Sequence, residues 1–158
     1  MKKLLVALVA LFCVNAVSAQ VNNAGIRFSG GIDIVGQYDL SKSNYIDGRL
    51  TLSGGLGVTG IYTWRLMDFN WTPQYGKWFL DAGIGGGFTN VGRDYGGSYS
   101  YLDVVGSIKL GFKFKKAPVS IIWDASPYFG LWNNVDRELE NEYSSPRGLG
   151  GVSVVYHF

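Results

Sequence analysis

The stretch VSVVYHF, residues 152–158, decides the fold class, because its side chains alternate as they do in a β-strand. One face of this strand carries Val152, Val154, Tyr156 and Phe158, and the other carries Ser153, Val155 and His157. Chain ends usually fray in water, so an apolar, aromatic strand at such a place is expected to be held by its surroundings. Those surroundings are either a protein core or lipid.

Residues 1–19 have the features of a secretory signal peptide in the usual order. Lys2 and Lys3 precede an apolar run, and small residues then lead to Ala19, after which we expect cleavage. An N-terminal membrane anchor is the alternative, but the apolar run is shorter than the roughly 20 residues that span a bilayer. We therefore expect an exported domain made of residues 20–158.

Cleavage leaves a domain with balanced charge. The chain has 14 Lys and Arg against 12 Asp and Glu, and without Lys2 and Lys3 the basic count becomes 14 − 2 = 12. A neutral domain lacks the basic surface that nucleic acid requires, so we expect no nucleic-acid partner. Metal-ligand spacing and a phosphate-binding loop are also absent from the sequence, and we expect no cofactor and no metal.

Beyond residue 19 the hydrophobic pattern has a period of two, broken by Gly, Asn, Ser and Asp, which predicts an all-β chain. The segments FSGGIDIVGQY (28–38) and LSGGLGVTGIY (52–62) match at an offset of 24 residues. Each Ser-Gly-Gly predicts a hairpin turn, unless glycine-rich strands merely look alike. Eight strands are predicted, at 23–29, 31–40, 45–52, 55–67, 78–89, 100–114, 118–132 and 150–158.

Apolar and charged side chains fall on opposite faces of these strands. In the strand at 100–114, Leu102, Val104 and Ile108 share one face, and Asp103 and Lys109 share the other. In a water-soluble sandwich or lipocalin-like barrel the apolar face lines the core, whereas in a membrane barrel it meets lipid. Aromatic residues near the strand ends favour the second arrangement. The predicted fold is an eight-stranded antiparallel up-and-down transmembrane β-barrel.

Together these features resemble the small OmpA-like and OmpX-like outer-membrane β-barrels. The resemblance covers residues 20–158 as a pattern, and its most specific motif is the end at 152–158. It implies that the barrel is surrounded by outer-membrane lipid. It also implies that the barrel assembly machinery recognises an insertion signal made of Val152, Val154, Tyr156 and Phe158.

The family's orientation would place both termini and the turn at 115–118 in the periplasm, with 91–100 and 133–149 outside. The connection 67–77 is then a periplasmic one and departs from the pattern, because such turns are usually short. Its Trp71 and Tyr75 could lie at the membrane interface.

The inward positions carry five residues of each sign. An eight-stranded barrel has room only for its own side chains, so we expect these charges to pair and to plug the lumen. A catalytic or ion-conducting set is the alternative. The predicted lumen network consists of Arg27, Arg49, Arg65, Lys109 and Lys113 with Asp33, Asp47, Asp81, Asp103 and Asp124.

The resemblance also extends to outer-membrane lipid A acyltransferases and deacylases, which share this barrel size and use His with Ser or Asp near the outer rim. The only histidine, His157, is predicted at the periplasmic rim, so a Ser-His pair on the outer face cannot be assembled. We expect His157 to form hydrogen bonds at the end of the lumen and the protein not to be an enzyme. A lipid-modifying enzyme or a barrel that binds lipid or a small ligand is the alternative.

The connection 133–149 is the candidate recognition loop, since loops on a rigid scaffold often carry binding. A merely solvated loop is the alternative. The candidate residues for an extracellular ligand of unknown identity are Trp132, Asp136, Arg137, Glu138, Glu140, Glu142, Tyr143 and Arg147. The expected role is therefore structural or one of surface interaction.

Pro127 does not fit the strand predicted at 118–132, because a closed barrel leaves no free edge for a residue without an amide hydrogen. A bulge there, or the exit of the strand from the bilayer, would accommodate it.

Overall fold

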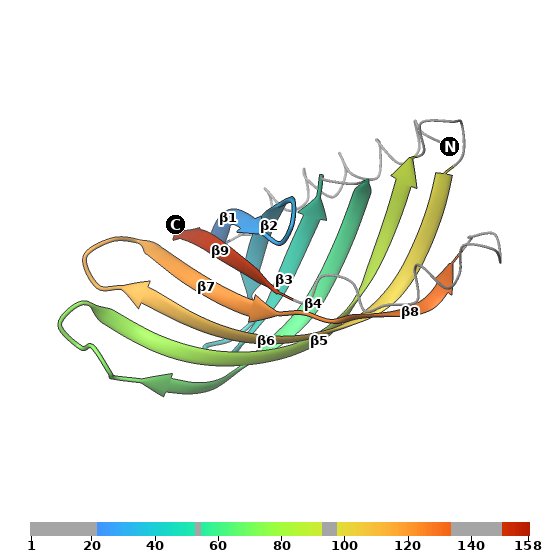
Figure 1. The fold of residues 1–158 in the computed structure, drawn as a ribbon. Coiled ribbons are helices and arrows are strands. Elements are labelled where there is room, and N and C mark those ends of the chain that lie inside the picture. The colour runs from blue at the N-terminus through green and yellow to red at the C-terminus, as the bar shows by residue number, and fades with distance from the viewer. Residues whose placement is uncertain (1–21, 53–54, 93–97, 134–149) are drawn as a thin grey trace.

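The structure is a computed structural model that describes residues 22–52, 55–92, 98–133 and 150–158, and these residues form strands and turns only (Figure 1). The strands are β1 (Asn23–Phe28), β2 (Ile32–Asp39), β3 (Asn44–Thr51), β4 (Leu56–Phe69), β5 (Gly76–Gly92), β6 (Ser98–Phe114), β7 (Val119–Ala125), β8 (Tyr128–Asn133) and β9 (Gly151–His157). Among the described residues there is no helix long and apolar enough to cross a membrane.

The strands close into a barrel. Neighbours follow the order β5-β4-β3-β2-β1-β9-β7-β6, and a further pairing of β5 with β6 completes the ring. All pairs are antiparallel. Both β7 and β8 pair with β6, so they are two halves of one strand, and the barrel has eight strands. The predicted fold is confirmed as an eight-stranded closed antiparallel barrel.

The C-terminal strand is held on both sides. Strand β9 pairs with β1 through Ala24 opposite Tyr156, and with β7 through Val119 opposite the same tyrosine. At its end the amide of His157 donates to the carbonyl of Pro118 at 2.8 Å, and that of Phe158 donates to Asn22 at 3.0 Å. These bonds hold His157 and Phe158 in the sheet.

The predicted turn at Ser29-Gly30-Gly31 joins β1 to β2. Gly30 has a φ of +79°, which glycine adopts without strain, and the Ser29 amide donates to the Gly31 carbonyl at 3.1 Å. The second Ser-Gly-Gly lies between β3 and β4, where residues 53–54 are outside the described part of the chain. Its Gly55 has a φ of +150°, and a Cβ there would lie 2.5 Å from the Asn90 carbonyl oxygen.

The sequence repeat has a geometric origin. Gly36 lies opposite Gly48, and Gly48 lies opposite Gly60, so each strand with its turn takes 12 residues in this part of the barrel. Two such units give the offset of 24 residues, which brings Gly36 and Gly60 to equivalent positions.

Pro127 interrupts the strand without shifting its register. Ala125 lies opposite Ile108 and Tyr128 opposite Val105, so the pairing with β6 continues in step across the break. The Gly106 amide donates to the Pro127 carbonyl at 3.1 Å, and proline has no amide hydrogen to return this bond. Of the two explanations considered for Pro127, a bulge is not found at this residue; the register shifts further along, where β8 pairs Gly130 with Asp103 and then Trp132 with Leu102.

A second irregularity lengthens the β4–β5 hairpin. The pairing moves from Arg65–Asp81 to Met67–Leu80, which leaves Leu66 as an extra residue and turns Asp68 toward the inner face. Because β4 continues to Phe69 and β5 begins at Gly76, the connection shrinks from the predicted 67–77 to 70–75. This turn is closer to the short turns of membrane barrels than the sequence pattern indicated.

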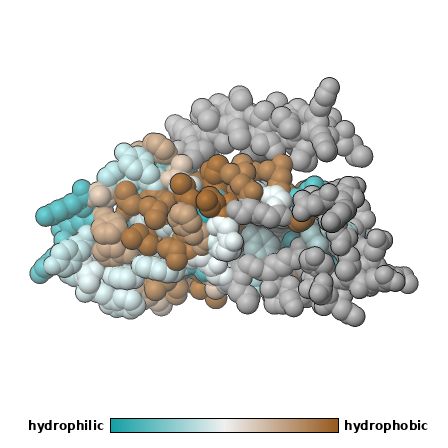
Figure 2. Space-filling model, turned by 45° about the horizontal axis from the view of Figure 1, so that its top comes forward, coloured by the Kyte–Doolittle hydropathy of each residue, from teal (hydrophilic) through white to brown (hydrophobic). Residues whose placement is uncertain are grey.

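Many large apolar side chains are exposed on the outside of this barrel and most charged side chains of its strands are buried inside it, which is the reverse of the arrangement in a water-soluble protein. Outward side chains such as Ile108, with 61% of its surface exposed, form an apolar band across the middle of the molecule (Figure 2). The outward positions of the described strands carry no charged residue. Val104, Ile108 and Ile121 therefore do not pack in a dry centre, as the water-soluble alternative requires. The buried charged side chains lie in the interior instead, together with apolar side chains such as Val35, Ile61 and Val155.

Candidate functional site

The barrel has two ends, the Phe158 end and the Gly30 end. The Phe158 end contains the turns 40–43, 70–75 and 115–118, and the Gly30 end contains the turn 29–31. The site between them is the lumen, where inward side chains from β1 to β7 form one network.

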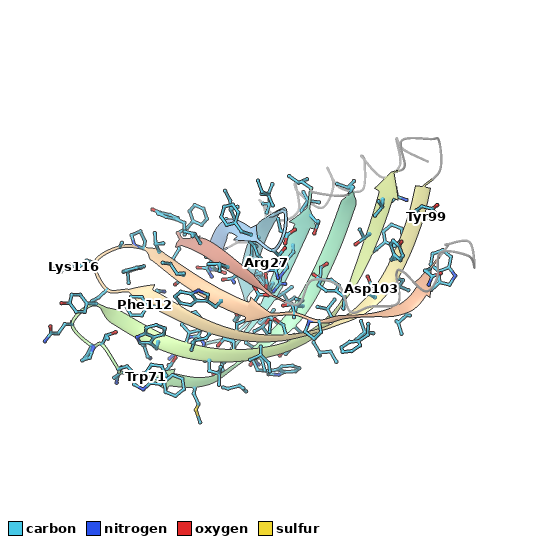
Figure 3. All side chains as sticks on the ribbon, viewed as in Figure 1. Arg27, Trp71, Tyr99, Asp103, Phe112 and Lys116 are labelled. Atoms are coloured by element: carbon cyan, nitrogen blue, oxygen red, sulfur yellow. The ribbon has the colours of Figure 1, made fainter. Side chains whose placement is uncertain are left out.

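Arg27 on β1 organises the first part of this network (Figure 3). Its Nε and Nη2 atoms donate to the two carboxylate oxygens of Asp124, each at 2.8 Å, and its Nη1 atom donates to Asp33 at 2.8 Å. Ser29 Oγ donates to Asp33 as well, at 3.0 Å. Arg27 and Asp33 are opposite one another on β1 and β2. Asp124 lies on β7, which is separated from β1 by β9. The guanidinium thus joins β1, β2 and β7, next to the pairing of the first strand β1 with the last strand β9.

Arg49 on β3 crosses the lumen. Strands β3 and β7 are four positions apart in either direction around the barrel, so they are diametrically opposite. The Arg49 Nη1 atom donates to Ser126 Oγ at 3.1 Å and lies 3.6 Å from Asp124 Oδ2. Its Nη2 atom donates to Asp47 on its own strand at 3.2 Å. Side chains from opposite walls are therefore in direct contact.

Lys109 on β6 forms a second crossing. Its Nζ atom forms a salt bridge with Asp47 on β3 and lies within hydrogen-bonding distance of Thr63 Oγ1 at 3.2 Å. The hydroxyl of Tyr45 accepts from Lys109 at 3.4 Å and donates to Asp81 at 2.8 Å. The lumen is bridged at two levels.

Arg65 on β4 ends the network at the Phe158 end. Its Nε atom donates to Asp81, and its guanidinium carbon lies 4.1 Å from the centre of the Phe79 ring. Asp68, turned inward by the bulge after Arg65, lies 3.5 Å from the Arg65 Nη1 atom and 2.6 Å from the Lys77 Nζ atom.

The predicted lumen residues differ in burial. Eight are buried: Arg27, Asp33, Asp47, Arg49, Asp81, Asp103, Lys109 and Asp124. The Arg65 side chain keeps 33% of its surface exposed. Lys113 is exposed at the Phe158 end and has no ion pair with any described residue. It does not join the plug, because it lies one residue from the end of β6, opposite Lys77.

Some members of the network were not predicted. Tyr45 and Ser126 are uncharged, so a search for inward charges did not select them, although their parity on the strands places both on the inner face. The Asp68–Lys77 pair depends on the bulge, which no feature of the sequence indicated.

A Ser-His-Asn array lies at the Phe158 end. Ser120 Oγ is 2.7 Å from His157 Nε2, and His157 Nδ1 is 2.5 Å from Asn23 Oδ1. The prediction that no Ser-His pair can be assembled concerned the outer face only, and it did not anticipate this contact at the Phe158 end. The contact joins β7, β9 and β1, and it depends on the closure of the barrel, which local sequence does not specify.

This array has the order of a nucleophile, a base and an orienting residue. Ser120, however, has no exposed surface, so a substrate cannot reach its hydroxyl in this structure. We interpret the array as a polar clasp that fixes the last strand to both of its neighbours.

We expect the replacement His157→Ala to lower the free energy of unfolding by about 1–2 kcal/mol, since two hydrogen bonds to polar groups are lost. Urea titration of the barrel folded in lipid vesicles measures this change. His157→Gln, which can keep one of the two bonds, should lose less. A loss from His157→Ala no larger than that from a substitution on the exposed turn 115–118 would contradict the clasp.

The remaining candidate residues lie at the surface. The members of the predicted insertion signal, Val152, Val154, Tyr156 and Phe158, are exposed on the outer side of β9. Trp132 is exposed near the end of β8, at the Gly30 end. The other residues of the candidate recognition loop, Asp136, Arg137, Glu138, Glu140, Glu142, Tyr143 and Arg147, lie outside the described residues.

Comparison with known proteins finds no family model, no curated protein and no solved structure that matches this chain. The class of the protein, an eight-stranded closed antiparallel β-barrel with a polar lumen, thus rests on its own geometry.

Proposed function

We propose that the protein is an integral outer-membrane β-barrel whose lumen is plugged by its own ion pairs. One observation carries this proposal: the outer surface of the strands is apolar and uncharged, whereas the charged residues of the strand centres are buried inside. Water would favour the opposite arrangement, because it solvates charges and excludes apolar groups. A hydrocarbon environment accounts for both faces at once.

Closure of the sheet supports the same conclusion. In hydrocarbon every backbone amide and carbonyl must be paired within the protein, and a closed barrel has no edge strand that leaves them free. Here β5 pairs with β6 and β1 with β9, so the described strands complete the ring.

The proposed role is structural, or one of interaction at the cell surface, and not that of an open pore. Contacts between opposite walls, such as Arg49 with Ser126, occupy the centre of the lumen. We also propose that the barrel is not an enzyme, which the burial of Ser120 supports. Recognition of an extracellular ligand through residues 133–149 belongs to this proposal as well.

The outer membrane is proposed as the location on two further grounds. The features of residues 1–19 are those of an export signal. The outer face of β9 presents alternate apolar and aromatic side chains ending at Phe158, in the form of the signal that outer-membrane barrels offer to their assembly machinery.

A gel of the cell's outer-membrane fraction tests the proposal. We expect the protein in that fraction to migrate faster before boiling than after it, because a folded membrane barrel resists detergent. Deletion of Phe158 should lower the amount of the fast-migrating form. Recovery of the protein as a freely dissolved species, with a single migration, would contradict membrane insertion.

A further inference from the structure

Among the residues that the structure describes, exposed charge gathers at one end of the barrel. Within the described residues, every exposed charged side chain lies at the Phe158 end, which forms the hydrophilic left end of the molecule in Figure 2. Five of them are basic and two are acidic. They are Lys42, Lys77, Lys113, Lys115, Lys116, Asp39 and Asp68.

Most of these lysines are without an acidic partner. Lys77 pairs with Asp68, which also contacts Arg65. Lys42, Lys113, Lys115 and Lys116, here called the rim lysines, form no ion pair with any described residue. Lys113 lies directly opposite Lys77 on the neighbouring strand, and like charges in such positions repel one another. An external anion at this end would relieve that repulsion.

An aromatic ridge adjoins the rim lysines on the outer surface. It consists of Phe69, Trp71, Trp78, Phe112, Phe114 and Trp123. Ring centres are 4.8 Å apart between Phe69 and Trp71 and 4.9 Å apart between Trp78 and Phe112. Trp71, Phe112 and Lys116 lie at the same end of the barrel in Figure 3.

The aromatic ridge and three of the rim lysines lie on two adjacent hairpins, β4–β5 and β6–β7, whereas Lys42 lies in the turn 40–43. On β6, Phe112 and Phe114 flank Lys113 and face outward while it faces inward. The Lys115 amide donates to the Tyr75 carbonyl at 2.9 Å, which joins the turn 115–118 to the turn 70–75. Cationic groups and aromatic rings are thus held next to one another, with the rings continuous with the apolar band.

We propose that this end of the barrel binds the headgroups of anionic phospholipids. This inference rests on the proposed function, because it requires the barrel to lie in a membrane. Tryptophan and other aromatic rings favour the depth of the lipid headgroups, and lysines near an anionic surface are attracted to it. The rim lysines would bind the phosphates while the acyl chains pack on the aromatic ridge.

Quenching of tryptophan fluorescence by brominated lipid tests this proposal. The whole exported domain is folded into phosphatidylcholine vesicles that contain a small fraction of either brominated phosphatidylglycerol or brominated phosphatidylcholine, at low salt. The tested variant replaces all four rim lysines by glutamine, and the matched control replaces them by arginine. These residues are exposed, so neither variant should prevent folding.

We expect the original barrel to favour phosphatidylglycerol over phosphatidylcholine, as measured by the ratio of quenching affinities. In the glutamine variant this ratio should fall about fivefold, the factor that corresponds to about 1 kcal/mol. The arginine variant should keep the original ratio, and added salt should reduce it because exposed charges are screened.

Three other outcomes would overturn the proposal. One is an inserted barrel with no preference for phosphatidylglycerol, and another is a preference that the glutamine variant retains. The third is that the inserted barrel sediments together with cell-wall polymer, that the glutamine variant does not, and that neither of them prefers phosphatidylglycerol. In each case the barrel has inserted, so the proposed function stands. Failure of all variants to insert into vesicles would instead contradict the proposed function.

Discussion

Replacing Arg27 by alanine is expected to lower the free energy of unfolding by about 3–5 kcal/mol, because it leaves buried carboxylates without their partner. Arg27 is 2% exposed and donates to both oxygens of Asp124 and to one of Asp33. Ser126 and Arg49 still approach Asp124 in the variant, whereas among the described residues Asp33 keeps its hydrogen bond from Ser29 alone. The expected loss is therefore dominated by the desolvated carboxylate of Asp33.

Equilibrium urea unfolding in vesicles of phosphatidylcholine alone, which offer Lys113 no anionic lipid, measures this effect. Lys113→Ala is the control, since Lys113 is also a predicted lumen cation but is exposed and lacks an ion pair with any described residue, and we expect its effect to stay within about 0.5 kcal/mol. Arg27→Lys keeps the charge but not the bidentate hydrogen bonds to Asp124, so its loss of unfolding free energy should lie between those of Arg27→Ala and Lys113→Ala. If Arg27→Ala and Lys113→Ala have equal effects, the buried network does not stabilise the barrel.

The alternation of side chains was sufficient to predict the inner face of the barrel. Ser-Gly-Gly turns and period-two patterns fix the parity of each strand, and parity assigns residues such as Asp47 and Lys109 to the lumen. In the structure these two residues form a salt bridge between walls that are three strands apart. Parity specifies the face of a residue, but it does not specify the partner across the lumen, because the partner depends on the stagger of all eight strands.

The contacts that the sequence could not predict arise from single-residue bulges in the strands and from the closure of the barrel. The bulge at Leu66 reverses the parity of the residues after it, so that Asp68 faces inward and pairs with Lys77. The clasp of Ser120, His157 and Asn23 forms only when β9 meets β1, and no local pattern encodes a contact between residues 134 positions apart. Lys113 has the correct parity, but its position near the strand end leaves it exposed.

Ile108→Arg is expected to destabilise the membrane-inserted barrel by about 2–4 kcal/mol, because it places a charge on the outer surface near the middle of the strand. Ile108 lies near the centre of β6, and 61% of its surface is exposed. In water an exposed isoleucine would accept arginine with an effect within about 0.5 kcal/mol. The size of the effect therefore distinguishes lipid from water as the surroundings of this face.

Phe114→Arg is the matched control, since Phe114 shares the outer face of β6 but lies at its last residue. The cost of an outward arginine falls to about 0–1 kcal/mol near the membrane interface, so the two variants should differ by about 2 kcal/mol or more in vesicles. Urea unfolding measures the effect of both substitutions. Because both variants introduce arginine into the same strand, the intrinsic strand propensity of arginine contributes to both and does not cause the difference between them. Since Lys113 and Lys115 flank Phe114, a small cost there also agrees with a membrane boundary at this end. Equal, small effects at both positions would mean that the apolar band faces water.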